Sequence, residues 1–301
     1  MKIIVANNIG FCFGVSRAIK IAESTLASKN NVYSLGPIIH NPQAVDELSR
    51  KGLKLLKQLP EKFDRNTTII LRTHGLTAQL QQKLSRAPVN LVDTTCPFVC
   101  RAQEIVKKLS RKKYQIILLG DKKHPEVESL VSYGNRQTLV VNSLAEVKKI
   151  FPGKKLAFLS QTTQSRQLFE QIARYLKKKN PGVKIFNTIC QSSANRQEEA
   201  VKIARNVDLL LVVGGKNSAN TRRLVRVASR FGPVKQIENY RELKDKWLKN
   251  IRTLGIISGA STPKKIIHNL IQHLQNKIKN TKIIPVAKLG QLIGGKYNVG
   301  K

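Results

Sequence analysis

Short apolar runs that are rich in β-branched residues alternate along the chain with amphipathic stretches of helical period. Six copies of this unit, each an apolar run, a polar loop and a helix, occur at residues 32–48, 67–84, 114–130, 155–176, 207–228 and 253–274. Continuous apolar runs are typical of strands that are buried on both faces of a parallel sheet, with the helices as crossovers. The pattern therefore predicts an α/β fold throughout.

The repeat divides the chain into three similar modules, each with two of these units and each entered near a cysteine. We predict their boundaries at residues 13–96, 97–190 and 191–282. Residues 1–12 contain a first strand, which we expect to pack onto the third module. Residues 283–301 are basic and rich in glycine without periodicity, and we predict that they form a C-terminal tail.

Composition indicates an ordinary globular protein. The 301 residues are 41% hydrophobic and 5% aromatic, and a chain of this length can bury a substantial core. No stretch approaches the ~18 apolar residues of a membrane span, and the N-terminus is too polar for a signal peptide. We therefore expect a cytoplasmic protein, in which four cysteines favour metal binding or catalysis over disulfides.

The formal net charge of +36 raises the alternative of a nucleic-acid partner, because Lys and Arg neutralise phosphates. The basic runs at residues 107–113, 175–180 and 276–282 are spread along helix ends and turns, without the interleaved aromatic residues of a single-strand binding surface. The distribution of these runs therefore argues against a nucleic-acid partner. A basic surface would instead steer anionic substrates and acidic partners toward the protein.

Three cysteines, Cys12, Cys96 and Cys190, lie at the predicted starts of helices with nearly equal separations. This spacing excludes the short ligand pairs of zinc ribbons and ferredoxins. Three thiolates could hold a structural zinc with a histidine as the fourth ligand, or a cubane iron–sulfur cluster with one open iron. Spacing leaves both possibilities open. The fourth cysteine, Cys100, follows Cys96 by one helical turn, and we predict that it is a buried thiol outside the site.

The predicted loops between strand and helix carry the unusual polar residues of the chain. In parallel sheets these loops lie at the carboxyl ends of the strands, where ligands bind, and helix N-termini favour anions and thiolates. Three of the five histidines occupy equivalent loops. A candidate cradle for a phosphate or diphosphate is therefore formed by His40, His74, His124, Ser218, Asn220 and Ser261.

Glu126 is a candidate general acid or base on this basic rim, although a first-turn glutamate can also simply complement the helix dipole. Thr162 could relay a proton through its hydroxyl or could be a helix cap. GGKNS at 214–218 is not a Walker A loop, and GFCFG at 10–14 is not a dinucleotide fingerprint.

Nine motifs in order from residue 1 to residue 282 together resemble the 4-hydroxy-3-methylbut-2-enyl diphosphate reductase family, the LytB-type iron–sulfur reductases of the non-mevalonate isoprenoid pathway. The motifs are GFCFGV, SLGPIIHNPQAV, RTHG, DTTCPFV, HPEVE, SQTT, IC followed by NRQEEAV, KNSANT and SGASTP.

The resemblance implies three modules in a pseudo-threefold arrangement around one [4Fe–4S] cluster that Cys12, Cys96 and Cys190 would ligate. Glu126 would donate a proton beside Thr162, which would also contact the substrate, and the open iron would bind the allylic hydroxyl. The substrate diphosphate would be held by His40, His74, His124, Ser218, Ala219, Asn220 and Ser261. Two-electron reductive dehydroxylation would yield isopentenyl and dimethylallyl diphosphate, with an acidic ferredoxin or flavodoxin as electron donor.

Four positions depart from the family pattern. Ala219 replaces a common serine and leaves only its backbone N–H to contribute, Ser193 and Ala194 stand where threonines are common, and Cys100 is not part of the pattern. None of these changes removes an expected cluster ligand or the expected acid.

Overall fold

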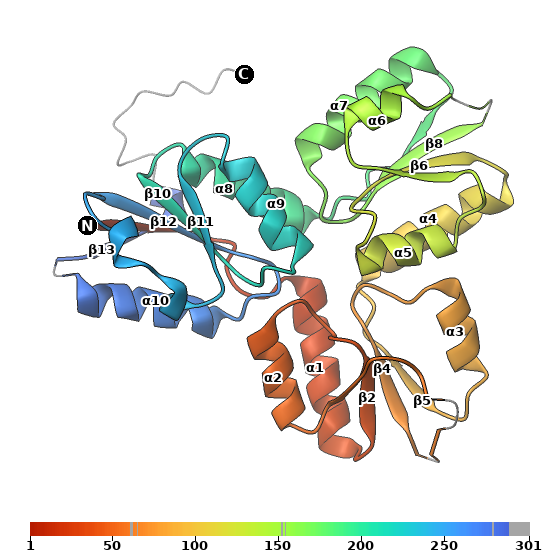
Figure 1. The fold of residues 1–301 in the computed structure, drawn as a ribbon, viewed down its shortest axis with the longest axis horizontal. Helices are drawn as coiled ribbons and strands as arrows, with labels where there is room; N and C mark the ends of the chain where they lie inside the picture. The colour runs from red at the N-terminus through yellow and green to blue at the C-terminus, as the bar shows by residue number, and fades with distance from the viewer. Residues whose placement is uncertain (61–62, 65, 152, 154, 279, 289–301) are drawn as a thin grey trace. The chain divides into compact units, whose positions relative to one another are not determined.

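The computed structural model describes residues 1–60, 63–64, 66–151, 153, 155–278 and 280–288. Every strand pair in these residues is parallel, and the strands form three separate sheets. The predicted α/β fold with three parallel-sheet modules is confirmed (Figure 1).

The first sheet has the order β3-β2-β4-β5, and Figure 1 shows α3 on the opposite side of this sheet from α1 and α2. Apolar side chains of β4 and α3 pack together in its core. The elements are α1 (Phe13–Ser28), β2 (Val32–Leu35), α2 (Pro42–Arg50), β3 (Lys54–Leu56), β4 (Thr68–Leu71), α3 (Ala78–Ser85) and β5 (Asn90–Asp93).

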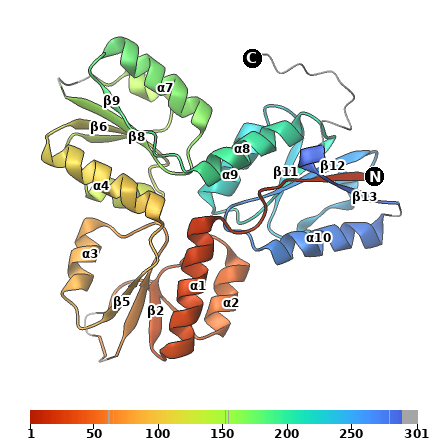
Figure 2. The ribbon, with the colours of Figure 1, turned by 180° about the vertical axis from the view of Figure 1, so that it is seen from behind.

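The second sheet has the order β7-β6-β8-β9. Along β6, Ile116 and Leu118 pack under α4 and α5, whereas Ile117 and Leu119 pack against α7 on the other face. Figure 2 shows α4 and α7 on opposite sides of this sheet. Burial on both faces explains why this strand is apolar without alternation. The elements are α4 (Pro97–Arg111), β6 (Gln115–Leu119), α5 (Pro125–Ser132), β7 (Thr138–Val141), α6 (Leu144–Lys148), β8 (Leu156–Ser160), α7 (Arg166–Lys179) and β9 (Lys184–Ile185).

The third sheet has the order β11-β10-β12-β1-β13, with α8 and α9 on one face and α10 on the other. The N-terminal strand pairs with β12 and β13, so residues from both ends of the chain form this sheet. The elements are β1 (Lys2–Val5), α8 (Gln191–Ala204), β10 (Leu209–Val213), α9 (Ala219–Ala228), β11 (Val234–Ile237), η1 (Tyr240–Glu242), η2 (Asp245–Trp247), β12 (Thr253–Ser258), α10 (Lys264–Lys277), β13 (Lys282–Pro285) and η3 (Val286–Lys288).

The chain forms two compact units. One unit is Cys12–Ser193, which contains the first two sheets, and the other is Met1–Phe11 with Ala194–Lys301, which contains the third. The third sheet extends into the segment that we predicted as a tail, because residues 283–285 of β13 lie within it, and η3 follows. Residues 289–301 lie outside the described residues. The pseudo-threefold arrangement of the modules stays a prediction.

The described helices include none that is both long enough and apolar enough to span a lipid bilayer.

Candidate active site

Three strand-to-helix loops of the unit Cys12–Ser193 bring the three predicted loop histidines together. His40 lies between β2 and α2, His74 between β4 and α3, and His124 is the N-cap of α5. The ring centroids of His40 and His74 are 4.4 Å apart, and that of His124 lies 5.6 and 5.3 Å from them. The structure therefore gathers these side chains into one cluster, at the carboxyl ends of their strands.

Thr73 fixes the loop of His74 against the loop of His40. Its backbone N–H and its hydroxyl both donate to the carbonyl of Ile38, at 3.2 and 2.9 Å. The Thr73 carbonyl in turn accepts the backbone N–H of Cys96 at 3.0 Å. These bonds join the histidine loops to one of the cysteines, so the relative position of the three groups does not depend on a ligand.

The histidine cluster suits an anion better than a metal ion. Burial, together with the neighbouring charges of His40, His124 and Arg72, lowers the pKa of His74 well below its ordinary value. The Nδ1 of His124 accepts the backbone N–H of Glu126 at 3.1 Å, which leaves the proton of the neutral ring on Nε2. Ligand atoms of the three rings lie within 4.8 Å of one another, close enough to share a metal ion. A protonated Nε2 cannot ligate a metal, however, whereas it can donate to a phosphate oxygen.

Glu126 is a buried carboxyl group with one polar partner residue. It is 2% exposed, and its two oxygens accept the backbone N–H of Thr162 at 2.6 Å and the Thr162 hydroxyl at 2.9 Å. Burial raises the pKa of Glu126 to about 7, against the opposing effect of these two hydrogen bonds. The group can therefore both release and take up a proton near neutral pH. A first-turn glutamate that only complements the helix dipole would not need this burial.

The three predicted cluster ligands also lie in this unit. Cys12 and Cys96 are the N-caps of α1 and α4, and Cys190 directly precedes α8. A Cβ atom at Gly14 would lie 2.6 Å from the Cys96 sulfur, so the first turn of α1 packs directly on that thiol. Burial raises the pKa of Cys96, and that of Cys190 to about 12, with further contributions from the other thiols and from Glu126.

This donor set fits an iron–sulfur cluster. All the cysteines are free of disulfides, and the three thiols are close enough to influence one another's ionisation. Ionising three neighbouring, half-buried thiols without a counter-charge is unfavourable. A metal centre that binds the three thiolates and releases their protons supplies the positive charge that compensates for this. Cys100 is half-buried rather than buried as we predicted, and its raised pKa arises from this partial burial and from Asp93.

The remaining predicted residues lie together in the other unit. Ser218 is the N-cap of α9 and accepts the backbone N–H of Thr221 at 3.3 Å, and Ala219 and Asn220 begin that helix. The loop of Ser261 is hydrogen-bonded to the end of β10, the strand that precedes α9. The Thr262 hydroxyl donates to the carbonyl of Val213, the last residue of β10, at 3.1 Å. Ser218, Ala219, Asn220 and Ser261 are all buried.

Comparison with known proteins settles the family. The family model described as LytB protein matches residues 3–275. This chain belongs to the LytB family. The 4-hydroxy-3-methylbut-2-enyl diphosphate reductase of Geobacter metallireducens is 42% identical over 276 residues, which cover 91% of this chain and 97% of the relative. The family resemblance of the motifs is thereby confirmed.

Two solved structures resemble the LytB-family fold of this chain. The E-1-hydroxy-2-methyl-but-2-enyl-4-diphosphate reductase of Plasmodium falciparum matches with a TM-score of 0.88 and 29% identity, over 99% of this chain and 94% of that one. A structure of (E)-4-hydroxy-3-methyl-but-2-enyl diphosphate reductase, described as the terminal enzyme of the non-mevalonate pathway, matches with a TM-score of 0.65 and 36% identity. The match covers 91% of this chain and 99% of the chain in that structure.

Sequence reasoning missed a repeated turn that positions two of the cysteines of this LytB-family chain. In DTTC at 93–96, the Asp93 carboxylate accepts the backbone N–H of the residue before Cys96, and the Thr94 hydroxyl donates to the carbonyl of Leu71. The backbone N–H of Cys96 donates to the carbonyl of Thr73, which lies two residues after Leu71.

NTIC at 187–190 repeats every one of these bonds. The Asn187 amide oxygen accepts the N–H of the residue before Cys190, and the Thr188 hydroxyl donates to the carbonyl of Ser160. The Cys190 N–H donates to the carbonyl of Thr162, again two residues further along, at 2.9 Å. Each turn thus fastens a cysteine to the loop that carries a candidate site residue. The shared pattern Asp/Asn-Thr-x-Cys was the available signal in the sequence.

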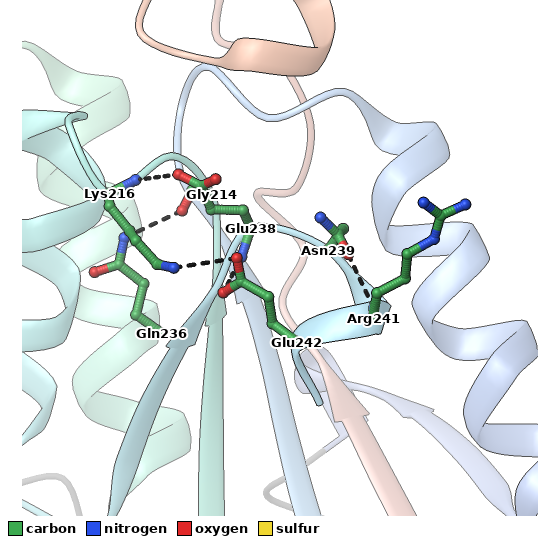
Figure 3. Close-up of polar contacts among 7 residues, drawn as sticks. All are labelled: Gly214, Lys216, Gln236, Glu238, Asn239, Arg241 and Glu242. Atoms are coloured by element: carbon green, nitrogen blue, oxygen red, sulfur yellow. Dashed lines mark hydrogen bonds and ion pairs between the residues drawn. The ribbon is translucent and has the colours of Figure 1, made fainter. Parts of the chain in front are cut away.

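A second missed feature is the acidic clamp on the loop that precedes Ser218, which we define as Glu238 and Glu242 (Figure 3). Glu238 accepts the backbone N–H of Lys216 at 2.8 Å, and Glu242 pairs with the Lys216 ammonium at 3.1 Å. The Gln236 amide also donates to the carbonyl of Gly214 at 3.1 Å. These bonds hold residues 214–218 in place. They cannot be recognised from a local sequence motif, because the bonded residues are about 22 positions apart in the chain.

Proposed function

We propose that this chain is a 4-hydroxy-3-methylbut-2-enyl diphosphate reductase. It would convert its substrate to isopentenyl and dimethylallyl diphosphate, in the last step of non-mevalonate isoprenoid precursor synthesis. The observation that carries the proposal is the convergence of three free thiols, a histidine cluster and one protonatable carboxyl group in the unit Cys12–Ser193. Membership of the LytB family supports the same conclusion.

Cys12, Cys96 and Cys190 would hold the cofactor. LytB-family reductases are iron–sulfur enzymes, and a donor set of three thiolates corresponds to one [4Fe–4S] cluster with one iron that lacks a protein ligand. Such a cluster supplies single electrons and a Lewis acid for the substrate hydroxyl. The repeated turns at 93–96 and 187–190 would keep two of the ligands in place before the cluster binds.

The diphosphate would bind at the histidine cluster. The protonated Nε2 of His124 offers a donor, and an anion would favour the charged forms of the neighbouring rings, including His74, whose pKa is low in its absence. Ser218, Asn220 and Ser261, with the backbone N–H of Ala219, present hydroxyl, amide and helix N-terminal groups of the kind that binds phosphate oxygens. We assign the diphosphate to these residues as well.

Glu126 would be the proton donor. The reaction takes up two electrons and two protons, breaks the allylic C–O bond and releases water. With a pKa of about 7, Glu126 holds a proton in a large fraction of the molecules at neutral pH. Once it has given the proton away, the N–H and hydroxyl of Thr162 stabilise the carboxylate that remains. Thr162 therefore has a positioning role beside the acid and also contacts the substrate.

An acidic ferredoxin or flavodoxin would deliver the electrons, since the chain carries a formal net charge of +36. A cytoplasmic location also belongs to the proposal, because the thiols must stay reduced to bind iron.

Anaerobic turnover tests the proposal. The purified protein, with dithionite-reduced methyl viologen as electron source, should convert 4-hydroxy-3-methylbut-2-enyl diphosphate to the two isoprenoid diphosphates. Glu126→Gln should keep its iron and lose about 10²- to 10⁴-fold in turnover. A wild-type protein that is loaded with iron and inert toward this substrate would overturn the proposed activity.

A further inference from the structure

Two exposed phenylalanines lie next to the cysteines at the N-termini of α1 and α4. Phe13 follows Cys12 and is 66% exposed, and Phe98 lies two residues after Cys96 and is 38% exposed. The packing of Gly14 on the Cys96 sulfur brings these two helix turns into contact. Other large hydrophobic side chains of the described residues are exposed as well, and these two differ from them in flanking two of the predicted cluster ligands. Exposed apolar groups that lie beside a site can mark an interaction surface.

Basic residues continue both helices on the same sides. On α1, Lys20 lies two turns beyond Phe13 and is exposed. On α4, Arg101 and Lys108 follow Phe98 at helical spacing and are also exposed. Arg17 joins the two helices, since its guanidinium donates to the carbonyl of Thr95 at 3.3 Å, in the turn before Cys96. We call this surface the Phe13–Phe98 face, and it consists of Phe13, Arg17, Lys20, Phe98, Arg101 and Lys108.

Two acidic groups near the face already have hydrogen-bond or ion-pair partners within the chain. Glu104 on α4 pairs with Lys107 at 2.7 Å, and Asp93 accepts the backbone N–H of Thr95 at 2.8 Å. The face therefore combines exposed aromatic rings and arginine with a net positive charge. Aromatic residues and arginine are the residue types that carry most of the binding energy in protein interfaces.

We propose that the Phe13–Phe98 face is the docking surface for an acidic protein that carries one electron at a time. The inference rests on the proposed function, in which each turnover consumes two electrons and two protons. The carrier is oxidised by one electron in each of two encounters. An acidic protein carrier fits the formal net charge of +36 of this chain.

Position and charge both point to this face. It flanks Cys12 and Cys96, so an electron that arrives here enters beside two of the three thiols that would hold the cluster. The cationic helix sides complement an acidic carrier and would steer its approach. The face consists of six side chains, and transient electron-transfer complexes have small interfaces.

Charge reversal on the face tests the proposal. Arg101→Glu and Lys20→Glu place acidic groups on the face without touching a cysteine, and Lys178→Glu on α7 is the matched control, since it reverses an exposed charge outside the face. At low salt, the KM for a reduced acidic flavodoxin should rise about tenfold in the two face variants and stay unchanged in the control. Turnover with dithionite-reduced methyl viologen should equal that of wild type in all three.

Direct titration of flavodoxin onto the iron-loaded protein separates this inference from the proposed function. Binding should weaken about tenfold in Arg101→Glu and should lose much of its dependence on salt. Undiminished binding in this variant would overturn the docking surface, whether or not the protein turns over substrate. Equal losses with flavodoxin and with methyl viologen would also overturn it, because they would place the effect at the cluster. Inert wild-type protein that still binds flavodoxin through this face would contradict only the proposed activity.

Discussion

Thr162→Val tests how this chain controls the protonation of Glu126. The Glu126 carboxylate receives two hydrogen bonds from Thr162, one from the backbone N–H at 2.6 Å and one from the hydroxyl at 2.9 Å. Both stabilise the charged form and oppose the burial that raises the pKa of Glu126 to about 7. Valine keeps the backbone donor and nearly the same shape, and it removes only the hydroxyl.

The size of the effect follows from the lost bond. A hydrogen bond to a charged group contributes about 1.5–3 kcal/mol, and 1.36 kcal/mol corresponds to a tenfold change in an ionisation constant. The loss should therefore move the pKa of Glu126 upward and extend its protonated form by about one to two pH units. Since the protonated carboxyl group delivers the proton, the rate falls as the pH rises through this pKa. In Thr162→Val the fall should begin at correspondingly higher pH.

The assay is anaerobic turnover with methyl viologen as electron source, with kcat/KM followed from neutral to alkaline pH. Thr162→Ser is the matched control, because it keeps the hydroxyl and should reproduce the wild-type profile. A Thr162→Val profile whose alkaline limb is unmoved, or has moved to lower pH, would refute the role of the hydroxyl in setting the pKa of Glu126.

Three further substitutions test other parts of the site. Thr94→Val should weaken the retention of iron against a chelator about fivefold, because it removes a buried hydrogen bond of the turn before Cys96, while Thr94→Ser should retain iron as wild type does. Cys100→Ser should leave the iron content and the visible absorbance of the anaerobic protein unchanged, whereas Cys96→Ser should lose most of both. Glu238→Ala frees the backbone N–H of Lys216, and should raise the KM for the diphosphate substrate a few-fold with little change in kcat; a drop in kcat alone would contradict a purely positioning role.

The sheets could be predicted because the strands are buried on both faces. Ile116, Ile117, Leu118 and Leu119 are all fully buried, so β6 is an apolar run without polar interruption. The strand β13 was missed for the opposite reason. It lies at the edge of the third sheet, buries one of its four residues and ends in Pro285, so its short apolar stretch does not have the length or pattern of a buried strand.

The proximity of His40 and His74 could be predicted, because they follow β2 and β4, neighbouring parallel strands whose carboxyl ends lie at the same edge of one sheet. His124 follows β6 of the second sheet, so its approach to the other two is a tertiary feature. The bonds that hold them could not be predicted. Thr73 is recognisable as a positioning residue only through its contact with Ile38, which is 35 residues away in the chain. The sequence likewise left the function of Glu126 open, and its burial against Thr162 is a tertiary feature.

Iron and acid-labile sulfide analysis of the anaerobically purified protein tests the central claim most directly. The account predicts about four irons and four sulfides per chain, with brown colour, and the loss of most of this iron when Cys12, Cys96 or Cys190 is replaced by serine. A colourless protein that contains one zinc, or one that keeps its iron in all three variants, would contradict the account.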